Sequence, residues 1–200
     1  LIDIVAFLQP HNDVYLPHLY NPARTQIYFG GSSSGKSVFL AQRAVIWLMG
    51  GGRNMLVCRA VGNTIRRSVF NEIRKLIRDW NISHLFKVNK SEMSITCANG
   101  YQILFSGLDD VEKLKSITPE KGVITDIWVE EATETQRTDL IQLRKRLRGR
   151  SEHPKTFTLS FNPILKTHHI YKDYFADIAW AEDQASYEND TLSILKTTYK

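Results

Sequence analysis

The chain has 200 residues, 42% of them hydrophobic, which suits one globular domain of ordinary size with a substantial core. Its longest uninterrupted apolar run covers only residues 44 to 49, and its first residues lack the basic region of a signal peptide. Two cysteines are too few for a disulfide framework, and a net charge of +5 is compatible with contact to a polyanion. We therefore expect a soluble, cytosolic chain without a membrane span.

A glycine-rich loop with the sequence GGSSSGKS follows the short run TQIYF. Its spacing, G-x-x-x-x-G-K-S, is that of a phosphate-binding P-loop, in which backbone N–H groups and the next helix N-terminus face an anion. A flexible serine-glycine linker is the alternative. A strand pattern before the loop and helical spacing of apolar residues after it favour the P-loop. The predicted nucleotide-binding residues of the loop are Gly30, Gly31, Ser32, Ser33, Ser34, Gly35, Lys36 and Ser37.

Two side chains of this loop have distinct predicted roles. Lys36 is expected to reach the β- and γ-phosphate oxygens of a nucleotide. The Ser37 hydroxyl is expected to complete the coordination of Mg²⁺, which takes few protein ligands and the rest from water and phosphates. The loop therefore predicts a magnesium-dependent nucleotide site.

Helices and strands alternate after the loop. A helix ends at GGGR, a buried strand NMLVCRA follows, and an amphipathic helix is expected over residues 65 to 80. Asn99-Gly100 predicts a β-hairpin between MSITC and QILFSG. The remaining elements are a buried strand VITDIWV, a basic helix TDLIQLRKRLRGR and a strand TFTLSFN. This alternation predicts an α/β fold with a mainly parallel central sheet flanked by helices.

Two adjacent glutamates end the predicted strand IWV. A P-loop enzyme needs an acid beside its metal and a residue that aligns the attacking water. Glu130 is expected to orient the water shell of the metal, and Glu131 to align and polarise the water. The alternative is that both acids begin the next helix, where the helix dipole favours them. Because the metal-side acid is more often Asp, Asp126 inside the strand is a fallback.

The segment LSFNP ends another predicted strand. Ser160 and Asn162 are short polar residues that could sense the γ-phosphate at the edge of the sheet. Asn-Pro also favours a turn on its own. The sequence leaves these two interpretations open.

The four segments IYFGGSSSGKS, NGYQILFSGLDDVEKLKS, DIWVEEATE and LSFNP occur in this order. Together they resemble the ATPase domain of the large terminase subunit of tailed bacteriophages, over nearly the whole chain. The resemblance implies a P-loop NTPase of the additional-strand, catalytic-glutamate type, with Lys36 and Ser37 in Walker A and Glu130 in Walker B. It also implies that Glu131 is the catalytic glutamate and that Ser160 to Asn162 form a coupling motif.

The same resemblance implies one P-loop ATPase domain over residues 1–200. Residues 1–24 would be an adenine-side segment, 25–165 the nucleotide-binding core, and 166–200 a C-terminal subdomain that leads to a nuclease domain absent from this chain. The ligands implied are ATP and Mg²⁺. The partners implied are double-stranded DNA, a portal protein, a small terminase subunit and further copies in a ring, in the host bacterial cytoplasm at the procapsid portal.

Several arginines are candidates for further roles. Many family members carry an arginine within the P-loop, where this chain has serines, so we expect an arginine finger supplied by a neighbouring subunit. The candidates for the finger are Arg144, Arg146 and Arg148. For the adenine pocket, the segment YNPARTQ offers Tyr20, Arg24 and Gln26, of which we select Arg24.

The basic residues also offer three surfaces for DNA phosphates, whose recognition is independent of base sequence. The stretch RKRLRGR has five basic residues in seven, but it is also typical of a solvated helix C-terminus. The other two candidate surfaces are Arg66 with Arg67, and Lys113 with Lys115.

The sequence thus predicts an ATP-hydrolysing motor domain that moves double-stranded DNA into a procapsid. A helicase-like DNA translocase would use the same site. A nucleotide-gated DNA-binding module that does not hydrolyse ATP is the alternative from another class.

Overall fold

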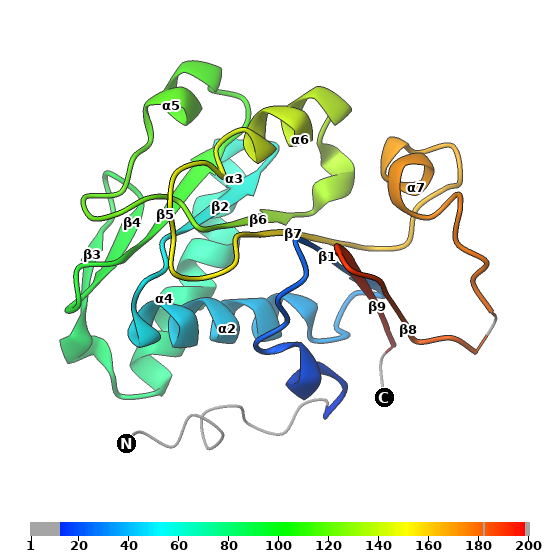
Figure 1. The fold of residues 1–200 in the computed structure, drawn as a ribbon. Coiled ribbons are helices and arrows are strands. Elements are labelled where there is room, and N and C mark those ends of the chain that lie inside the picture. The colour runs from blue at the N-terminus through cyan, green and yellow to red at the C-terminus, as the bar shows by residue number, and fades with distance from the viewer. Residues whose placement is uncertain (1–12, 182, 199–200) are drawn as a thin grey trace.

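The computed structural model describes residues 13–181 and 183–198, and these residues form one nine-stranded sheet with helices on both faces (Figure 1). The strands are β1 (Thr25–Gly30), β2 (Met55–Arg59), β3 (Phe86–Asn89), β4 (Ser94–Cys97), β5 (Gln102–Gly107), β6 (Asp126–Glu130), β7 (Thr156–Phe161), β8 (Ser186–Glu188) and β9 (Leu192–Thr197). The longer helices are α2 (Lys36–Gly50), α4 (Asn71–Asp79) and α6 (Arg137–Arg144). Shorter helical turns are η1 (Asp13–His18), α3 (Gly62–Ile65), η2 (Arg66–Phe70), η3 (Ser83–Leu85), α5 (Val111–Ser116), η4 (Ala132–Glu134) and α7 (His169–Tyr174).

The order of strands in the sheet is β3-β4-β5-β2-β6-β7-β1-β9-β8. The neighbours from β5 to β9 in this order are all parallel, and β4, β3 and β8 add antiparallel edges. The strand of the glycine loop, β1, and the strand of the two glutamates, β6, are separated by β7. This arrangement confirms the predicted mainly parallel fold with one additional strand between the loop and the glutamates.

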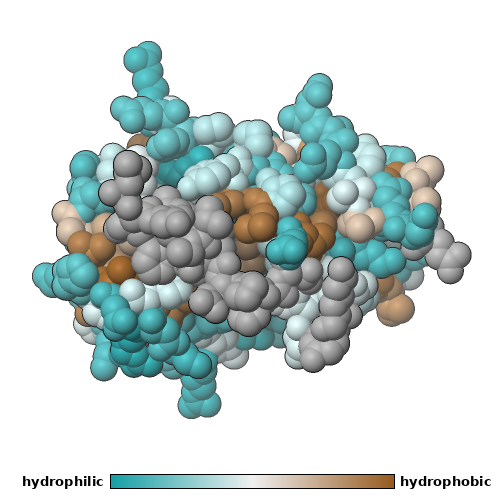
Figure 2. Space-filling model, turned by 90° about the horizontal axis from the view of Figure 1, so that it is seen from below, coloured by the Kyte–Doolittle hydropathy of each residue, from teal (hydrophilic) through white to brown (hydrophobic). Residues whose placement is uncertain are grey.

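Two apolar layers hold the helices to the sheet. In Figure 1, α2 and α4 lie below the sheet, and α5 and α6 lie above it. The central strands β5, β6 and β7 are buried along their whole length, which explains why they read as nearly continuous apolar runs in the sequence. Figure 2 shows the molecule from below, on the side of α2 and α4: hydrophilic residues cover most of the visible coloured surface, and hydrophobic residues show near the middle and in smaller areas at the left and right.

The predicted hairpin is present. Strands β4 and β5 pair in antiparallel fashion, and Gly100 of the connecting Asn99-Gly100 has a left-handed φ of 86°. This conformation is the reason that the turn needs glycine. The third strand of this meander, β3, and the edge strand β8 were not predicted, because both are short and lie largely at the surface.

Two predicted helices differ from the observed ones. The helix expected over residues 65–80 is divided at Ser68, whose φ of −97° and ψ of −108° are not helical, and a π-helical turn precedes α4. The basic helix ends at Arg144 instead of reaching Arg150. Beyond this end, the Arg146 guanidinium donates to the carbonyls of Lys115 and Ile117, so the segment that was predicted to be helical lies against the chain at the end of α5.

The C-terminal segment does not form a separate subdomain throughout. Strand β9 pairs in parallel with the whole of β1, so residues 192–197 belong to the central sheet and not to a distinct unit. Among the described residues, no helix is long and apolar enough to cross a membrane.

Candidate active site

The glycine loop leaves the end of β1 and is held from two sides. The Tyr15 hydroxyl donates to the Ser34 carbonyl at 2.9 Å, and the Ser34 and Thr197 hydroxyls lie 2.8 Å apart. Gly30 is required by close approach, because a Cβ at this position would lie 1.9 Å from the Thr197 carbonyl oxygen. Gly35 adopts a left-handed φ of 87° immediately before α2, so the loop turns directly into the helix. The backbone is thereby shaped as a cradle at a helix N-terminus.

A cavity of about 200 Å³ opens at this loop, at the carboxyl ends of the parallel strands. The loop lines it from Ser32 to Val38, and Glu131, Ser160, Phe161 and Asn162 line it from β6 and β7. The fold therefore brings together three segments that are distant in the sequence. Ser37 and Glu131, for example, are more than 90 residues apart and line the same cavity. This edge is where open α/β sheets bind ligands.

Lys36 lies at the floor of this loop and is buried. Its ammonium donates to the carbonyls of Gly30 and Gly31, each at 2.9 Å, and contacts Asn162 Oδ1 at 3.4 Å. Burial lowers the pKa of Lys36, and the negative charge of Glu131 opposes that effect. The lysine is thus positioned between the loop and the ends of β6 and β7.

Glu131 follows β6 in a left-handed conformation, with φ 48° and ψ 49°. This turn brings its side chain to the cavity, whereas the preceding residue stays in the strand. The alternative that both glutamates begin the next helix does not hold for Glu130, which is the last residue of β6. Glu131 directly precedes η4, a single 3-10 turn, but its side chain makes no capping hydrogen bond there. A carboxylate beside the P-loop lysine suits the alignment of water.

Glu130 is the last residue of β6 and is 6% exposed. Its Oε2 accepts a hydrogen bond from the Ser68 hydroxyl at 2.9 Å and lies 3.8 Å from the Arg59 guanidinium. Burial raises the pKa of Glu130 to about 7, although Ser68 and Arg59 both favour the charged form. Its Oε2 is therefore held by η2 and by the end of β2, and Glu130 is not among the residues that line the cavity.

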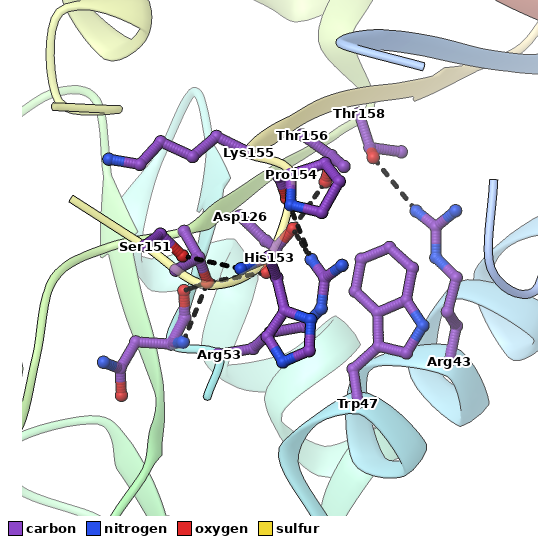
Figure 3. Close-up of polar contacts among 12 residues, drawn as sticks. Arg43, Trp47, Arg53, Asp126, Ser151, His153, Pro154, Lys155, Thr156 and Thr158 are labelled. Atoms are coloured by element: carbon purple, nitrogen blue, oxygen red, sulfur yellow. Dashed lines mark hydrogen bonds and ion pairs between the residues drawn. The ribbon is translucent and has the colours of Figure 1, made fainter. Parts of the chain in front are cut away.

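The fallback acid, Asp126, lies at the first residue of β6 and hence at the opposite end of the strand. It is an internal anchor: Arg53 donates to it at 2.8 Å, and the Thr125 and Thr156 hydroxyls donate at 2.7 Å each (Figure 3). The Arg53 guanidinium also stacks 4.3 Å from the Trp47 ring centre. Asp126 is therefore not available to a metal at the P-loop, and the fallback was wrong.

Ser160 and Asn162 end the strand between β1 and β6. The Ser160 hydroxyl accepts a hydrogen bond from the Trp128 indole at 2.9 Å, which ties β7 to β6. Asn162 reaches the Lys36 ammonium, as described above. A turn alone does not account for these contacts, since both residues line the cavity.

The predicted arginines do not gather at the loop. Arg144 contacts Thr25 at 3.1 Å and Tyr174 at 2.7 Å, so its guanidinium is held at the first residue of β1, far from the glycines at the other end. Arg146 is engaged with backbone carbonyls of the α5 region, and burial lowers its pKa. Arg148 is exposed.

The predicted adenine residues are likewise not brought to the loop. Arg24 precedes β1 and contacts the Lys155 carbonyl at 3.4 Å, at the end of the strand remote from the glycines. Gln26 is fully buried, and its side chain bonds the Asn21 carbonyl and accepts from Arg43. Tyr20 is 63% exposed. The choice of Arg24 was therefore wrong, because a strand of six residues separates it from the loop.

The DNA candidates lie on two surfaces. Arg66 and Arg67 are exposed on the π-helical turn η2, close in sequence to Ser68. Lys115 is exposed near the end of α5, and the side chain of Lys113 lies outside the described residues.

Four residues of the site were missed by sequence reasoning. Tyr15 and Thr197 support the loop, and Arg59 and Ser68 contact Glu130. These four residues come from segments outside the motifs. Only Arg59 carried a signal in the sequence: it ends a predicted buried strand, and the carboxyl ends of parallel strands meet at the edge of the sheet where ligands bind.

A single strand, β7, lies between the strand that carries the glycine loop and the strand that ends in the two glutamates, and the chain has the fold of a P-loop NTPase. A family model described as phage terminase large subunit matches residues 22–200, and the chain belongs to this family.

Known relatives agree with this assignment. The large terminase subunit of Bacillus phage SPP1 is 31% identical over 165 residues, which are 76% of this chain and 39% of that protein. The chain thus spans about two fifths of that relative. The large terminase of a thermophilic bacteriophage has the same fold, with a TM-score of 0.68 at 14% identity over 98% of this chain and 44% of that one; it has also been solved with ADP. The N-terminal domain of the DNA packaging ATPase from bacteriophage phi29 gives a TM-score of 0.68 at 12% identity, over 91% and 94% of the two chains.

Proposed function

We propose that this chain is the magnesium-dependent, ATP-hydrolysing motor domain of a terminase large subunit, which drives double-stranded DNA into a procapsid. The observation that carries the proposal is the single cavity shared by Lys36, Ser37, Glu131 and Asn162. It combines a phosphate cradle, a cation and a carboxylate at one edge of the sheet. The ADP complex of the terminase from the thermophilic bacteriophage supports a nucleotide as the ligand.

Hydrolysis at such a site is a matter of positioning and charge. Backbone N–H groups of the loop and the Lys36 ammonium would hold the β- and γ-phosphates. Glu131 would accept a hydrogen bond from the attacking water and hold it in line with the γ-phosphate. Ser160 and Asn162, on the intervening strand, would sense the loss of that phosphate, since Asn162 already contacts Lys36.

Mg²⁺ fits the donors present. The Ser37 hydroxyl and the Glu130 carboxylate supply oxygen atoms of the kind Mg²⁺ prefers, at the start of α2 and at the end of β6. We assign Ser37 to the metal directly and Glu130 to its water shell. When bound, the ion would neutralise charge on the β- and γ-phosphate oxygens.

The remaining assignments concern partners. We propose that Arg148, the exposed arginine among the three finger candidates, reaches the site of a neighbouring subunit in a ring, since Arg144 and Arg146 are engaged within the chain. Arg66 and Arg67 are the exposed pair that we assign to DNA phosphates. A portal protein and a small terminase subunit, in the host cytoplasm, complete the proposed setting.

The test is steady-state ATP hydrolysis with Mg²⁺, with and without double-stranded DNA, at rising protein concentration. We expect Glu131→Gln and Lys36→Ala each to lower kcat by at least about 100-fold, the usual effect of removing a catalytic group. Glu134→Gln removes a carboxylate from the same turn and is the matched control, because Glu134 pairs with Arg59 at the surface. A wild-type rate for Glu131→Gln would refute its catalytic role.

Two further results separate the alternatives. Strand separation coupled to hydrolysis would favour a helicase-like translocase. Nucleotide affinity without turnover, at every concentration and with DNA present, would favour a nucleotide-gated DNA-binding module.

A further inference from the structure

The helical segment between β2 and β3 is broken next to the active site. A π-helical turn, Arg66–Phe70, joins α3 to α4, and Ser68 lies at the kink with non-helical dihedral angles. Such turns occur as short interruptions of helices, frequently at functional sites. ATP hydrolysis as described above does not use this turn, although Arg66 and Arg67 within it are the pair assigned to DNA phosphates.

The turn is anchored on one side and open on the other. Val69 and Phe70 are buried, and the Phe70 ring packs edge to face against Phe105 with 5.0 Å between ring centres. Arg66 and Arg67, which precede the kink, are exposed. One short segment therefore links the core under the sheet to a cationic surface.

Ser68 is also the point at which this segment touches the site. Its hydroxyl donates to Glu130 Oε2 at 2.9 Å, while the Arg59 guanidinium lies 3.8 Å from the same oxygen and also pairs with Glu134 at 3.4 Å. The hydrogen bond from Ser68 is thus the shorter of the two contacts to this oxygen. It restrains the orientation of the Glu130 carboxylate through this oxygen.

We propose that Ser68 is a positioning residue for Glu130, and that the turn Arg66–Phe70 transmits the position of this carboxylate to Arg66 and Arg67. This inference rests on the proposed function, in which Glu130 orients the water shell of Mg²⁺. Glu130 would reorient when it hydrogen-bonds to the water shell of the ion, and the hydrogen bond from Ser68 would carry that change into the kinked turn. Because the kink interrupts regular helical hydrogen bonding, it is the place where the segment can move without displacing α4.

The first test measures the affinity of the chain for ATP-γ-S by isothermal titration, with and without Mg²⁺. The quantity of interest is the ratio of the dissociation constant without Mg²⁺ to the dissociation constant with Mg²⁺, which is large when the ion strengthens binding. We expect Ser68→Ala to reduce this ratio about tenfold, the effect of losing one hydrogen bond to a charged group, while the affinity without Mg²⁺ changes little. Ser68→Thr keeps a hydroxyl and should restore the ratio.

The matched control is Thr64→Val. Thr64 stands in the preceding turn, and its hydroxyl donates to the Val61 carbonyl at 2.6 Å instead of to the site. This variant should retain the wild-type ratio. A general loss of structure in the segment would lower the ratio in Thr64→Val as well and would contradict a specific role for Ser68.

The second test measures hydrogen exchange in peptides that cover residues 62–79. In the wild type, we expect ATP-γ-S with Mg²⁺ to change the exchange of the turn Arg66–Phe70, and ATP-γ-S alone to change it less. In Ser68→Ala, the additional effect of Mg²⁺ should disappear. Wild-type behaviour of Ser68→Ala in both tests would overturn the inference and leave the proposed function intact, whereas failure of the wild type to bind ATP-γ-S would overturn the proposed function.

Discussion

Replacement of Glu130 by glutamine tests the electrostatics of the site without any ligand. Burial raises the pKa of this carboxyl from its ordinary value of 4.5 to about 7. The folded state therefore keeps a proton that the unfolded chain gives up between these two values. The contribution of this group to stability is fully present below pH 4.5 and is lost as the pH rises through about 7.

The size of the effect follows from the same two values. At about 1.4 kcal/mol for each pH unit between them, the wild type loses roughly 3 kcal/mol of unfolding free energy through this group. Glu130→Gln has no proton to lose at this position. The free energy of unfolding of the variant, relative to the wild type, should therefore increase by roughly 3 kcal/mol between acidic and mildly alkaline pH.

The assay is urea unfolding of both proteins at about pH 4.5 and about pH 8, since other titrating groups cancel in the difference. Ser68→Ala provides a second comparison, because the hydrogen bond that it removes favoured the charged form of Glu130 and lowered its pKa in the folded state. The upper end of the pH window of destabilisation should therefore rise, while its lower end stays at the unfolded-state pKa of 4.5. Parallel changes of stability with pH in the wild type and in Glu130→Gln would refute the argument that burial controls this carboxyl.

Three substitutions test the structural supports of the site by urea unfolding. Trp128→Phe should lower the free energy of unfolding by about 2 kcal/mol, because the Ser160 hydroxyl loses the indole donor and the core loses volume. An unchanged midpoint of the urea transition would contradict this. Gly30→Ala should cost at least about 2 kcal/mol and weaken nucleotide binding, since its Cβ would lie 1.9 Å from the Thr197 carbonyl oxygen; wild-type stability would show that the loop can shift away. Arg43→Met should cost about 3 kcal/mol, since the buried guanidinium bonds side chains of β1 and β7; a neutral result would show that these groups find other partners.

Arg43 carries a buried positive charge, and the hydrogen bonds of its guanidinium go to neutral side chains. Its guanidinium donates to Gln26 at 2.6 Å and to Tyr28 at 2.9 Å. It also donates to Thr158 at 3.0 Å and lies 4.5 Å from the centre of the Trp47 ring (Figure 3). These neutral groups and the aromatic face disperse the charge. They also explain why Gln26 does not serve a nucleotide.

Local patterns in the sequence determined the elements and the loop. The spacing of Gly30, Gly35, Lys36 and Ser37 specifies a turn into a helix, because it encodes the backbone freedom and the groups that this turn needs. The Asn99-Gly100 turn and the buried run before Glu130 are local in the same sense, since backbone conformation and alternation depend on neighbouring residues. The parallel sheet followed from the alternation of helices and strands.

Only the tertiary structure decided which distant residues meet. Strand order placed β7 between β1 and β6, brought Thr197 against the loop and put Asp126 at the wrong end of its strand for a metal. Likewise, packing assigned Arg144 to Thr25 and Tyr174, and a kink turned Ser68 toward Glu130. The physical reason is that residue type and spacing fix local geometry, whereas the partner of a polar side chain depends on contacts between segments that the chain brings together only when the sheet has formed.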